Sequence, residues 1–149
     1  MNKASTVVFI GHNDCYGVSS ERLTFTITEE IKKGAINFLS GGQGGFDRLV
    51  ASTIYKLKEQ YPHIKNILVI PYPNFTVFDN ELFDEIIYPQ DFEKYHYKSA
   101  IPARNRYMVK NSYAAICFIT HNYGGAAKTF EYAKRKGLHI YNISNKGYR

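Results

Sequence analysis

Short, strongly apolar runs alternate with amphipathic stretches along the chain, and this alternation constrains the fold more than any other feature of the sequence. We predict strands at residues 6–10, 35–39, 66–70, 85–88, 114–119 and 138–143. We predict helices at residues 20–33, 46–60, 102–112 and 126–136. Strands that alternate with helices indicate βαβ units and a mostly parallel sheet. Because 149 residues fit one domain, the sequence predicts an α/β fold: a single Rossmann-like domain over residues 1–149, with helices on both faces of the sheet.

Two segments have no clear periodicity. Residues 71–83 form a long irregular stretch, and stretches of this length are often functional or mobile. The sequence leaves open whether this stretch closes over a binding site as a lid. Residues 90–100 are polar and rich in tyrosine, and we predict a loop there. Pro102 suits the first turn of the helix that follows, where a missing backbone N–H removes no hydrogen bond.

The chain is basic, with 19 Lys and Arg residues against 13 Asp and Glu residues and a formal net charge of +6. A positive net charge favours anionic ligands. The basic residues are scattered, however. Two clusters, at residues 32–33 and 134–136, fall at predicted helix ends, where cations complement the helix dipole. The charge therefore favours a small anionic ligand and does not by itself require a nucleic acid.

Two cysteines are too few for a disulfide framework or a cysteine-based zinc site, so we expect neither. The apolar run near the N-terminus is too short for a signal peptide or a membrane span. We therefore expect a soluble, cytoplasmic protein with no membrane partner.

Glycine-bearing loops follow three of the predicted strands, at residues 11–14, 41–45 and 120–125. The carboxyl ends of parallel strands lie at one edge of the sheet, where ligands of open α/β folds bind. Two of these loops lead directly into helices. Glycine lets the backbone approach a phosphate, and a helix N-terminus offers free N–H groups and a partial positive charge. The three loops together predict a site for a phosphate-bearing ligand at this edge.

The familiar nucleotide-binding motifs are absent from these loops. The run Gly-Gly-Gln-Gly-Gly at residues 41–45 does not have the glycine spacing of GxGxxG. No Gly-Lys-Ser/Thr closes it as in a P-loop. We therefore expect neither a bound NAD cofactor nor ATP hydrolysis, and we assign no cofactor.

Polar side chains and glycines at this edge form the candidate site. Arg104 and Asn105 lie early in the predicted third helix, where the arginine fork could hold a phosphate or serve only as a surface or capping group. Asp47 could contact a ligand or simply complement a helix dipole. His12 and His121 have no third ligand nearby, so we expect no metal. The candidate ligand-binding residues are Gly11, His12, Asn13, Gly41, Gly42, Gln43, Gly44, Gly45, Asp47, Arg104, Asn105, His121, Gly124, Gly125, Lys128 and Thr129.

Four stretches of the chain carry a family resemblance. They are Phe-Ile-Gly-His-Asn-Asp-Cys from residue 9, Ser-Gly-Gly-Gln-Gly-Gly-Phe-Asp from residue 40, Ala-Arg-Asn-Arg-Tyr-Met-Val from residue 103 and Thr-His-Asn-Tyr-Gly-Gly-Ala-Ala-Lys-Thr-Phe-Glu from residue 120. As a set they resemble the SLOG superfamily, which includes YpsA-like proteins, the DNA-processing protein DprA and the lonely-guy phosphoribohydrolases. The resemblance covers nearly the whole chain and is strongest to small YpsA-like proteins of Firmicutes and their phages. It implies a Rossmann-like fold, a nucleotide-type ligand and helices through which two copies could pair as a homodimer.

The lonely-guy enzymes cleave a base from a nucleoside monophosphate and carry the motif Pro-Gly-Gly-x-Gly-Thr-x-x-Glu. Gly124, Gly125, Thr129 and Glu131 resemble parts of this motif, although the spacing is changed, the proline is absent and a lysine intrudes. The resemblance places the catalytic arginine of these enzymes at Arg104. If the chain is a hydrolase, Glu131 and Arg104 are therefore its candidate catalytic residues.

Three functions follow, in order of preference. The first is a binding module that senses or sequesters a phosphate-bearing nucleotide, such as an ADP-ribose-like or cyclic signal. The second is an N-glycoside hydrolase in which Glu131 stabilises the ribosyl cation. The third is single-stranded nucleic-acid binding. We rank it last because the basic residues are scattered and the chain has no tryptophan, although tyrosine and phenylalanine can stack on bases.

Overall fold

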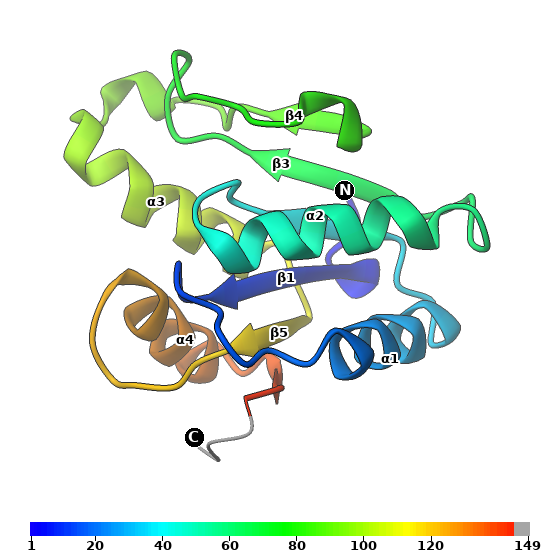
Figure 1. Cartoon of the computed structure of the whole chain (residues 1–149). Coiled ribbons are helices and arrows are strands. Elements are labelled where there is room, and N and C mark those ends of the chain that lie inside the picture. Colours follow the sequence, from blue (N-terminus) through cyan, green and yellow to red (C-terminus); the bar gives the residue numbers. More distant parts are fainter. Residues whose placement is uncertain (145–149) are drawn as a thin grey trace.

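A computed structural model describes residues 1–144 and contains one sheet flanked by helices (Figure 1). The strands are β1 (Thr6–Gly11), β2 (Asn37–Ser40), β3 (Lys65–Val69), β4 (Glu85–Ile87), β5 (Ala114–Phe118) and β6 (His139–Asn142). The α-helices are α1 (Ser20–Lys32), α2 (Gly45–Leu57), α3 (Tyr97–Lys110) and α4 (Gly125–Arg135). Short 3₁₀ helices are η1 (Lys3–Ser5), η2 (Asn80–Leu82) and η3 (Phe92–Lys94).

The six strands of the described chain form a parallel sheet in the order β4-β3-β2-β1-β5-β6. The chain runs outward from β1 to β4, then returns to place β5 and β6 on the other side of β1. This reversal puts the topological switch point between β1 and β5, where open α/β sheets bind ligands. The arrows of β1, β3 and β5 point to the same side in Figure 1, which is the edge that carries the three glycine loops. The predicted Rossmann-like fold is confirmed.

Both faces of the sheet are covered, as predicted. Val7 and Phe9 of β1 face α1 and α2, whereas Val8 and Ile10 face α3 and α4, and all four side chains are buried. Successive side chains of a strand point to opposite faces, so a strand buried on both sides is apolar over most of its length. This explains why the first strand reads as a continuous apolar run.

The third helix begins earlier than the sequence predicts. Because η3 and the first turn of α3 fall within residues 90–100, the prediction of a loop there is wrong. His96 caps α3, since its Nδ1 accepts a hydrogen bond from the backbone N–H of Lys98 at 3.3 Å. Pro102 consequently lies inside the helix and not in its first turn. Arg104 and Asn105 therefore lie further along the helix than the sequence indicates.

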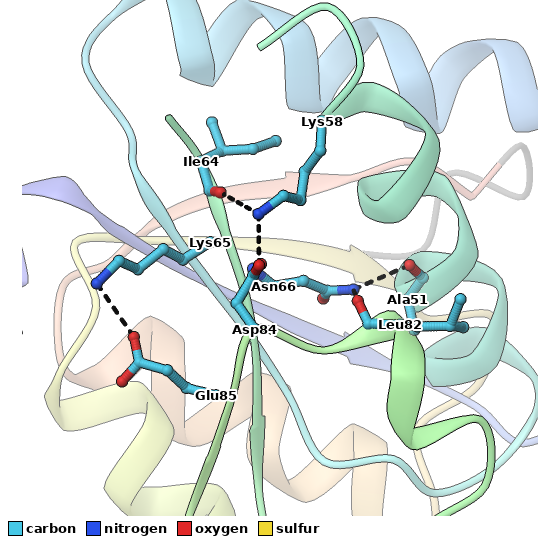
Figure 2. A network of polar contacts seen from close by, with 8 residues as sticks. All are labelled: Ala51, Lys58, Ile64, Lys65, Asn66, Leu82, Asp84 and Glu85. Atoms are coloured by element: carbon cyan, nitrogen blue, oxygen red, sulfur yellow. Dashed lines mark hydrogen bonds and ion pairs between the residues drawn. The ribbon is translucent and has the colours of Figure 1, made fainter. Parts of the chain in front are cut away.

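A buried polar network ties β3 and β4 to α2 at the opposite edge of the sheet (Figure 2). Nδ2 of Asn66 donates to the carbonyl oxygens of Ala51 at 3.0 Å and Leu82 at 2.9 Å. The backbone N–H of Asn66 donates to Asp84 at 2.7 Å, and the carboxylate of Asp84 also pairs with Lys58. Asn66 itself is 1% exposed. The network fixes the segment before β4, which the apolar pattern of the sequence does not reveal.

Replacing Asn66 by alanine is expected to lower the free energy of unfolding by about 1–3 kcal/mol, because two carbonyl oxygens lose their donor. Chemical denaturation measures this loss. The matched control is Lys65→Ala, which breaks only the exposed ion pair with Glu85 at 3.2 Å and should change stability by no more than about 0.5 kcal/mol. Equal losses in the two variants would contradict a structural role for the network.

Candidate functional site

A cavity of about 570 Å³ opens at the carboxyl edge of the sheet, beside the switch point between β1 and β5. This volume lies within the range of small-molecule sites, roughly 300–1,000 Å³. Its walls come from the loops after β1, β2 and β5, from α3, and from the first turns of α2 and α4. The predicted site residues that line it are Gly11, His12, Asn13, Gln43, Gly44, Asp47, Arg104, Asn105, His121, Gly124, Gly125 and Thr129.

Other predicted site residues lie outside this cavity. Gly41 is buried beneath Arg104, whereas Gly42 and Gly45 line a second hollow on the other side of the glycine loop. Lys128 is exposed on α4 and does not line the cavity. The same holds for Glu131, whose carboxylate pairs with Lys134 at 3.4 Å on the outer surface of α4.

Arg104 connects three parts of the site. Its Nη1 donates to the carbonyl oxygens of Gly41 at 2.8 Å and Val69 at 2.9 Å. Its Nη2 donates to Oε1 of Gln43 at 2.8 Å, and its Nε donates to Oδ1 of Asn105 at 2.9 Å. These four bonds use most of the five guanidinium N–H donors. Arg104 is 2% exposed. Its main structural role is therefore to hold the glycine loop after β2 against α3 and β3.

Glycine is required at position 41 because of this arginine. A Cβ atom added to Gly41 would lie 2.7 Å from Cζ of Arg104, closer than two carbon atoms pack without displacement. A side chain at residue 41 would therefore displace the guanidinium from its position against the Gly41 carbonyl. Gly42 has a φ of 63°, which favours glycine, and a Cβ there would lie 2.6 Å from Cδ1 of Leu68.

Asp47 is the buried carboxylate of the cavity. It is 9% exposed, and its Oδ2 accepts a hydrogen bond from the backbone N–H of Gln43 at 2.9 Å. Burial raises the pKa of Asp47 to about 6, although the Gln43 N–H and the positive charge of Arg104 oppose this rise. Burial also lowers the pKa of Arg104 to about 10, and the charge of Asp47 opposes that fall. The opposite charges of Asp47 and Arg104 therefore partly offset the cost of burying each of them in the cavity wall.

The first turns of α2 and α4 have nearly the same backbone geometry but different surroundings. Gly44 precedes α2 with φ 92° and ψ 177°, and Gly124 precedes α4 with φ 91° and ψ 174°. Asn13 fills the space before α2, because its backbone oxygen and its Oδ1 both accept from the N–H of Gly45, at 2.9 and 3.0 Å. A Cβ added at Gly124 or Gly125 would meet nothing within 4 Å. The N-terminus of α4 is therefore the more open of the two.

A stack of three rings closes one side of the cavity. The rings of His12 and His121 lie 3.6 Å apart between centroids, and those of His121 and Tyr123 lie 3.8 Å apart. Nε2 of His12 accepts a hydrogen bond from the N–H of Thr120 at 3.1 Å, which requires the proton on Nδ1. Burial, followed by the charge of His121, lowers the pKa of His12. The stack thus joins the loops after β1 and β5 with a neutral His12.

Sequence reasoning missed several residues of the cavity wall. Tyr123 lies within a predicted loop but is not among the predicted site residues, and Ile101 and Met108 supply apolar surface from α3. The sequence does offer a signal for Tyr123, because it lies between His121 and Gly124, which are both predicted site residues. No comparable signal exists for the other two: Ile101 lies outside the predicted third helix, and the sequence does not distinguish the apolar Met108 from an ordinary core residue.

Within residues 1–144, no group of three or more His, Cys, Asp and Glu side chains is arranged to hold a metal ion. None of the helices described is both long and apolar enough to cross a membrane.

Comparisons with known sequences identify one family and two similar proteins. A family model for the YspA SLOG family matches residues 7–145. The chain is 27% identical over 139 residues to the SPbeta prophage-derived protein YoqJ of Bacillus subtilis, a match that covers 79% of this chain and 81% of that protein. It is 25% identical over 142 residues to a UPF0398 protein of Oenococcus oeni, covering 88% of this chain and 73% of the relative.

Comparisons with solved structures show the fold. DNA processing protein A (DprA) of Streptococcus pneumoniae superposes with a TM-score of 0.64 at 18% identity, covering 93% of this chain. DprA of Helicobacter pylori, described for its single-stranded DNA binding mode, gives a TM-score of 0.61 at 20% identity over the same share. The chain spans 50% of the first DprA chain and 64% of the second.

Proposed function

Because this chain belongs to the YspA SLOG family, we propose that it binds a phosphate-bearing nucleotide in the cavity at the carboxyl edge of its sheet. The ligand is a small nucleotide of the AMP, ADP-ribose or cyclic-nucleotide class, which the protein senses or sequesters. The basic net charge of +6 favours such an anion over a neutral ligand.

One observation carries the proposal: the cavity at the switch point contains the open N-terminus of α4. Its first backbone N–H groups have no intrahelical partner, and no side chain of the Gly124 cap satisfies them. A phosphate at this position meets N–H donors and the positive end of the helix dipole. The space beside Gly124 and Gly125 admits phosphate oxygens close to the backbone.

Binding without cleavage is the simpler reading of the same cavity. Glu131 faces away from it, and the carboxylates among the described lining residues are Asp14 and Asp47. Asp47 is already engaged by Gln43 and faces the charge of Arg104. N-glycoside hydrolysis with Glu131 as the acidic group would need that side chain to move from its pair with Lys134.

A mixed-ligand binding experiment tests the proposal directly. The protein is incubated with AMP, NAD, ADP-ribose and cyclic ADP-ribose, and bound and free fractions are separated by ultrafiltration and identified by mass spectrometry. We expect at least one nucleotide to be retained intact. Release of free base would indicate a hydrolase instead, and a pool recovered entirely in the filtrate would contradict binding of these ligands.

Replacing Gly125 by valine is expected to weaken binding of the retained nucleotide by about tenfold or more. The fold should be unaffected, because a Cβ at this position meets nothing within 4 Å, yet the branched side chain would occupy the phosphate position. Isothermal titration calorimetry measures the change. Ser20→Val makes a matched change at the first residue of α1, outside the cavity, and should leave affinity unaltered. Undiminished binding by Gly125→Val would place the phosphate elsewhere.

Single-stranded DNA is a second candidate ligand, favoured by the likeness to the Helicobacter pylori DprA described for that binding mode. Phosphate-backbone binding releases counterions, so affinity should fall steeply between about 50 and 200 mM salt. Fluorescence anisotropy with a labelled oligonucleotide measures this dependence. The absence of any anisotropy change at low salt would remove this candidate and leave the small nucleotide.

A further inference from the structure

We propose that the second hollow is a subsite for the base of a free mononucleotide whose phosphate lies in the neighbouring cavity. We call this hollow the aromatic groove and define it by Arg48, Tyr72, Phe75 and Phe78, which line it together with residues of the glycine loop. The inference rests on the proposed function, because it assigns one part of the same ligand. It also gives a role to the segment 71–83, which the sequence leaves without one.

The rings of the aromatic groove come from the segment between β3 and β4. Tyr72 and Phe75 meet edge to face with centroids 5.8 Å apart. The guanidinium of Arg48 lies over the ring of Phe78, with Cζ 4.6 Å from the centroid. Phe78 is nevertheless 56% exposed. A large apolar side chain held in place by a cation, but still open to solvent, leaves surface for another flat ring.

The aromatic groove and the cavity are neighbours across the glycine loop. Asn13, Gln43 and Gly44 line both of them. Oδ1 of Asn13 accepts from the N–H of Gly45, and Oε1 of Gln43 accepts from Arg104. Because both amide oxygens are used, the two side chains retain their NH₂ groups as donors at the junction. Donors at this junction suit acceptor atoms of a ligand that extends from one hollow into the other.

A nucleobase fits these surroundings better than an aliphatic group. Flat heteroaromatic rings stack on aromatic side chains and on arginine guanidinium groups, and every base has a face for such stacking. The groove holds about 390 Å³ and the cavity about 570 Å³. These volumes suit one small ligand that spans the junction, with the base in the groove and the phosphate near α4.

The chain contains no tryptophan, so a single introduced tryptophan reports directly on the groove. We expect the fluorescence of Phe78→Trp to be quenched saturably by AMP, because a stacked base contacts the indole. The control is Phe25→Trp on α1, an exposed aromatic position away from both hollows, whose fluorescence AMP should leave unchanged. An unquenched Phe78→Trp protein that still binds AMP by calorimetry would overturn the assignment of the base to this groove.

A comparison of two ligands separates failure of the subsite from failure of the proposed function. Wild-type protein is titrated with AMP and with ribose 5-phosphate, which has the same phosphate but no base. We expect AMP to bind more tightly, and Phe78→Ala to weaken AMP binding by about 5- to 100-fold without changing ribose 5-phosphate binding.

Each of the other outcomes contradicts the base subsite, the proposed function or the free mononucleotide as occupant. Equal wild-type affinity for AMP and ribose 5-phosphate would overturn the base subsite and leave phosphate binding intact. The absence of binding by either ligand would overturn both proposals. A single-stranded oligo(dA) of about ten nucleotides that quenches Phe78→Trp when AMP does not would overturn the free mononucleotide as occupant.

Discussion

Replacing Arg104 by alanine is expected to lower the free energy of unfolding by about 3–5 kcal/mol, because a buried guanidinium that makes four hydrogen bonds is removed. The carbonyl oxygens of Gly41 and Val69 would lose their donors, and Asp47 would remain buried without its compensating charge. Thermal and chemical denaturation measure the loss. A loss of this size should lower the melting temperature by roughly 10 °C or more for a domain of this length.

Arg106→Ala is the matched control, because Arg106 is exposed on the same helix and its removal should change stability by no more than about 0.5 kcal/mol. Arg104→Lys adds a second test, since lysine keeps the charge but cannot reproduce the planar set of donors. We expect it to remain strongly destabilised. An Arg104→Ala protein as stable as wild type but unable to bind nucleotide would instead make Arg104 a direct phosphate ligand.

The sequence predicts the sheet well because its strands carry a strong, local signal. A strand buried on both faces is apolar over most of its length, as Val7 to Ile10 are, and its burial therefore shows in the sequence itself. The start of α3 carries no such signal. Its first turn is polar, and its cap is His96 in place of the usual Ser, Thr, Asp or Asn. Pro102 instead indicates a helix start at residue 102, whereas α3 begins at Tyr97 in the structure.

The sequence predicts where the candidate site lies in the fold, but it does not predict the contacts between the side chains of the site. Parallel topology brings the three glycine loops to one edge, which requires only the order of the elements. The N–H donors of Arg104 are taken up by acceptors of Gly41, Gln43 and Val69. These acceptors come from two other segments of the chain, so the sequence alone does not show which donors remain for a ligand. The exposure of the Glu131 side chain likewise depends on the orientation of α4 about its axis, which is set by its packing against β1 and α3. Residue type and spacing identify such groups but not the direction in which they point.

Replacing Asp47 by asparagine is expected to change how stability depends on pH. The pKa of Asp47 is raised from 3.8 to about 6 in the folded protein, so between these values the folded state holds a proton that the unfolded state has released. The free energy of unfolding of the wild type therefore falls as pH rises through this window, by about 3 kcal/mol from this group. Asparagine cannot ionise and removes this contribution, while its Oδ1 still accepts from the N–H of Gln43.

The measurement is denaturation of both proteins at several values between pH 4 and pH 8. The difference in unfolding free energy, variant minus wild type, should rise by about 2 kcal/mol between pH 4 and pH 6. Above about pH 7 the difference should be constant, because Asp47 is ionised in both the folded and the unfolded wild type; this range is the internal control. Curves that stay parallel across the whole range would show that burial in the cavity wall does not hold a proton on Asp47. A rising difference would mean that the cavity wall carries a carboxylate that takes up a proton more readily than an exposed one, next to the place proposed for an anionic ligand.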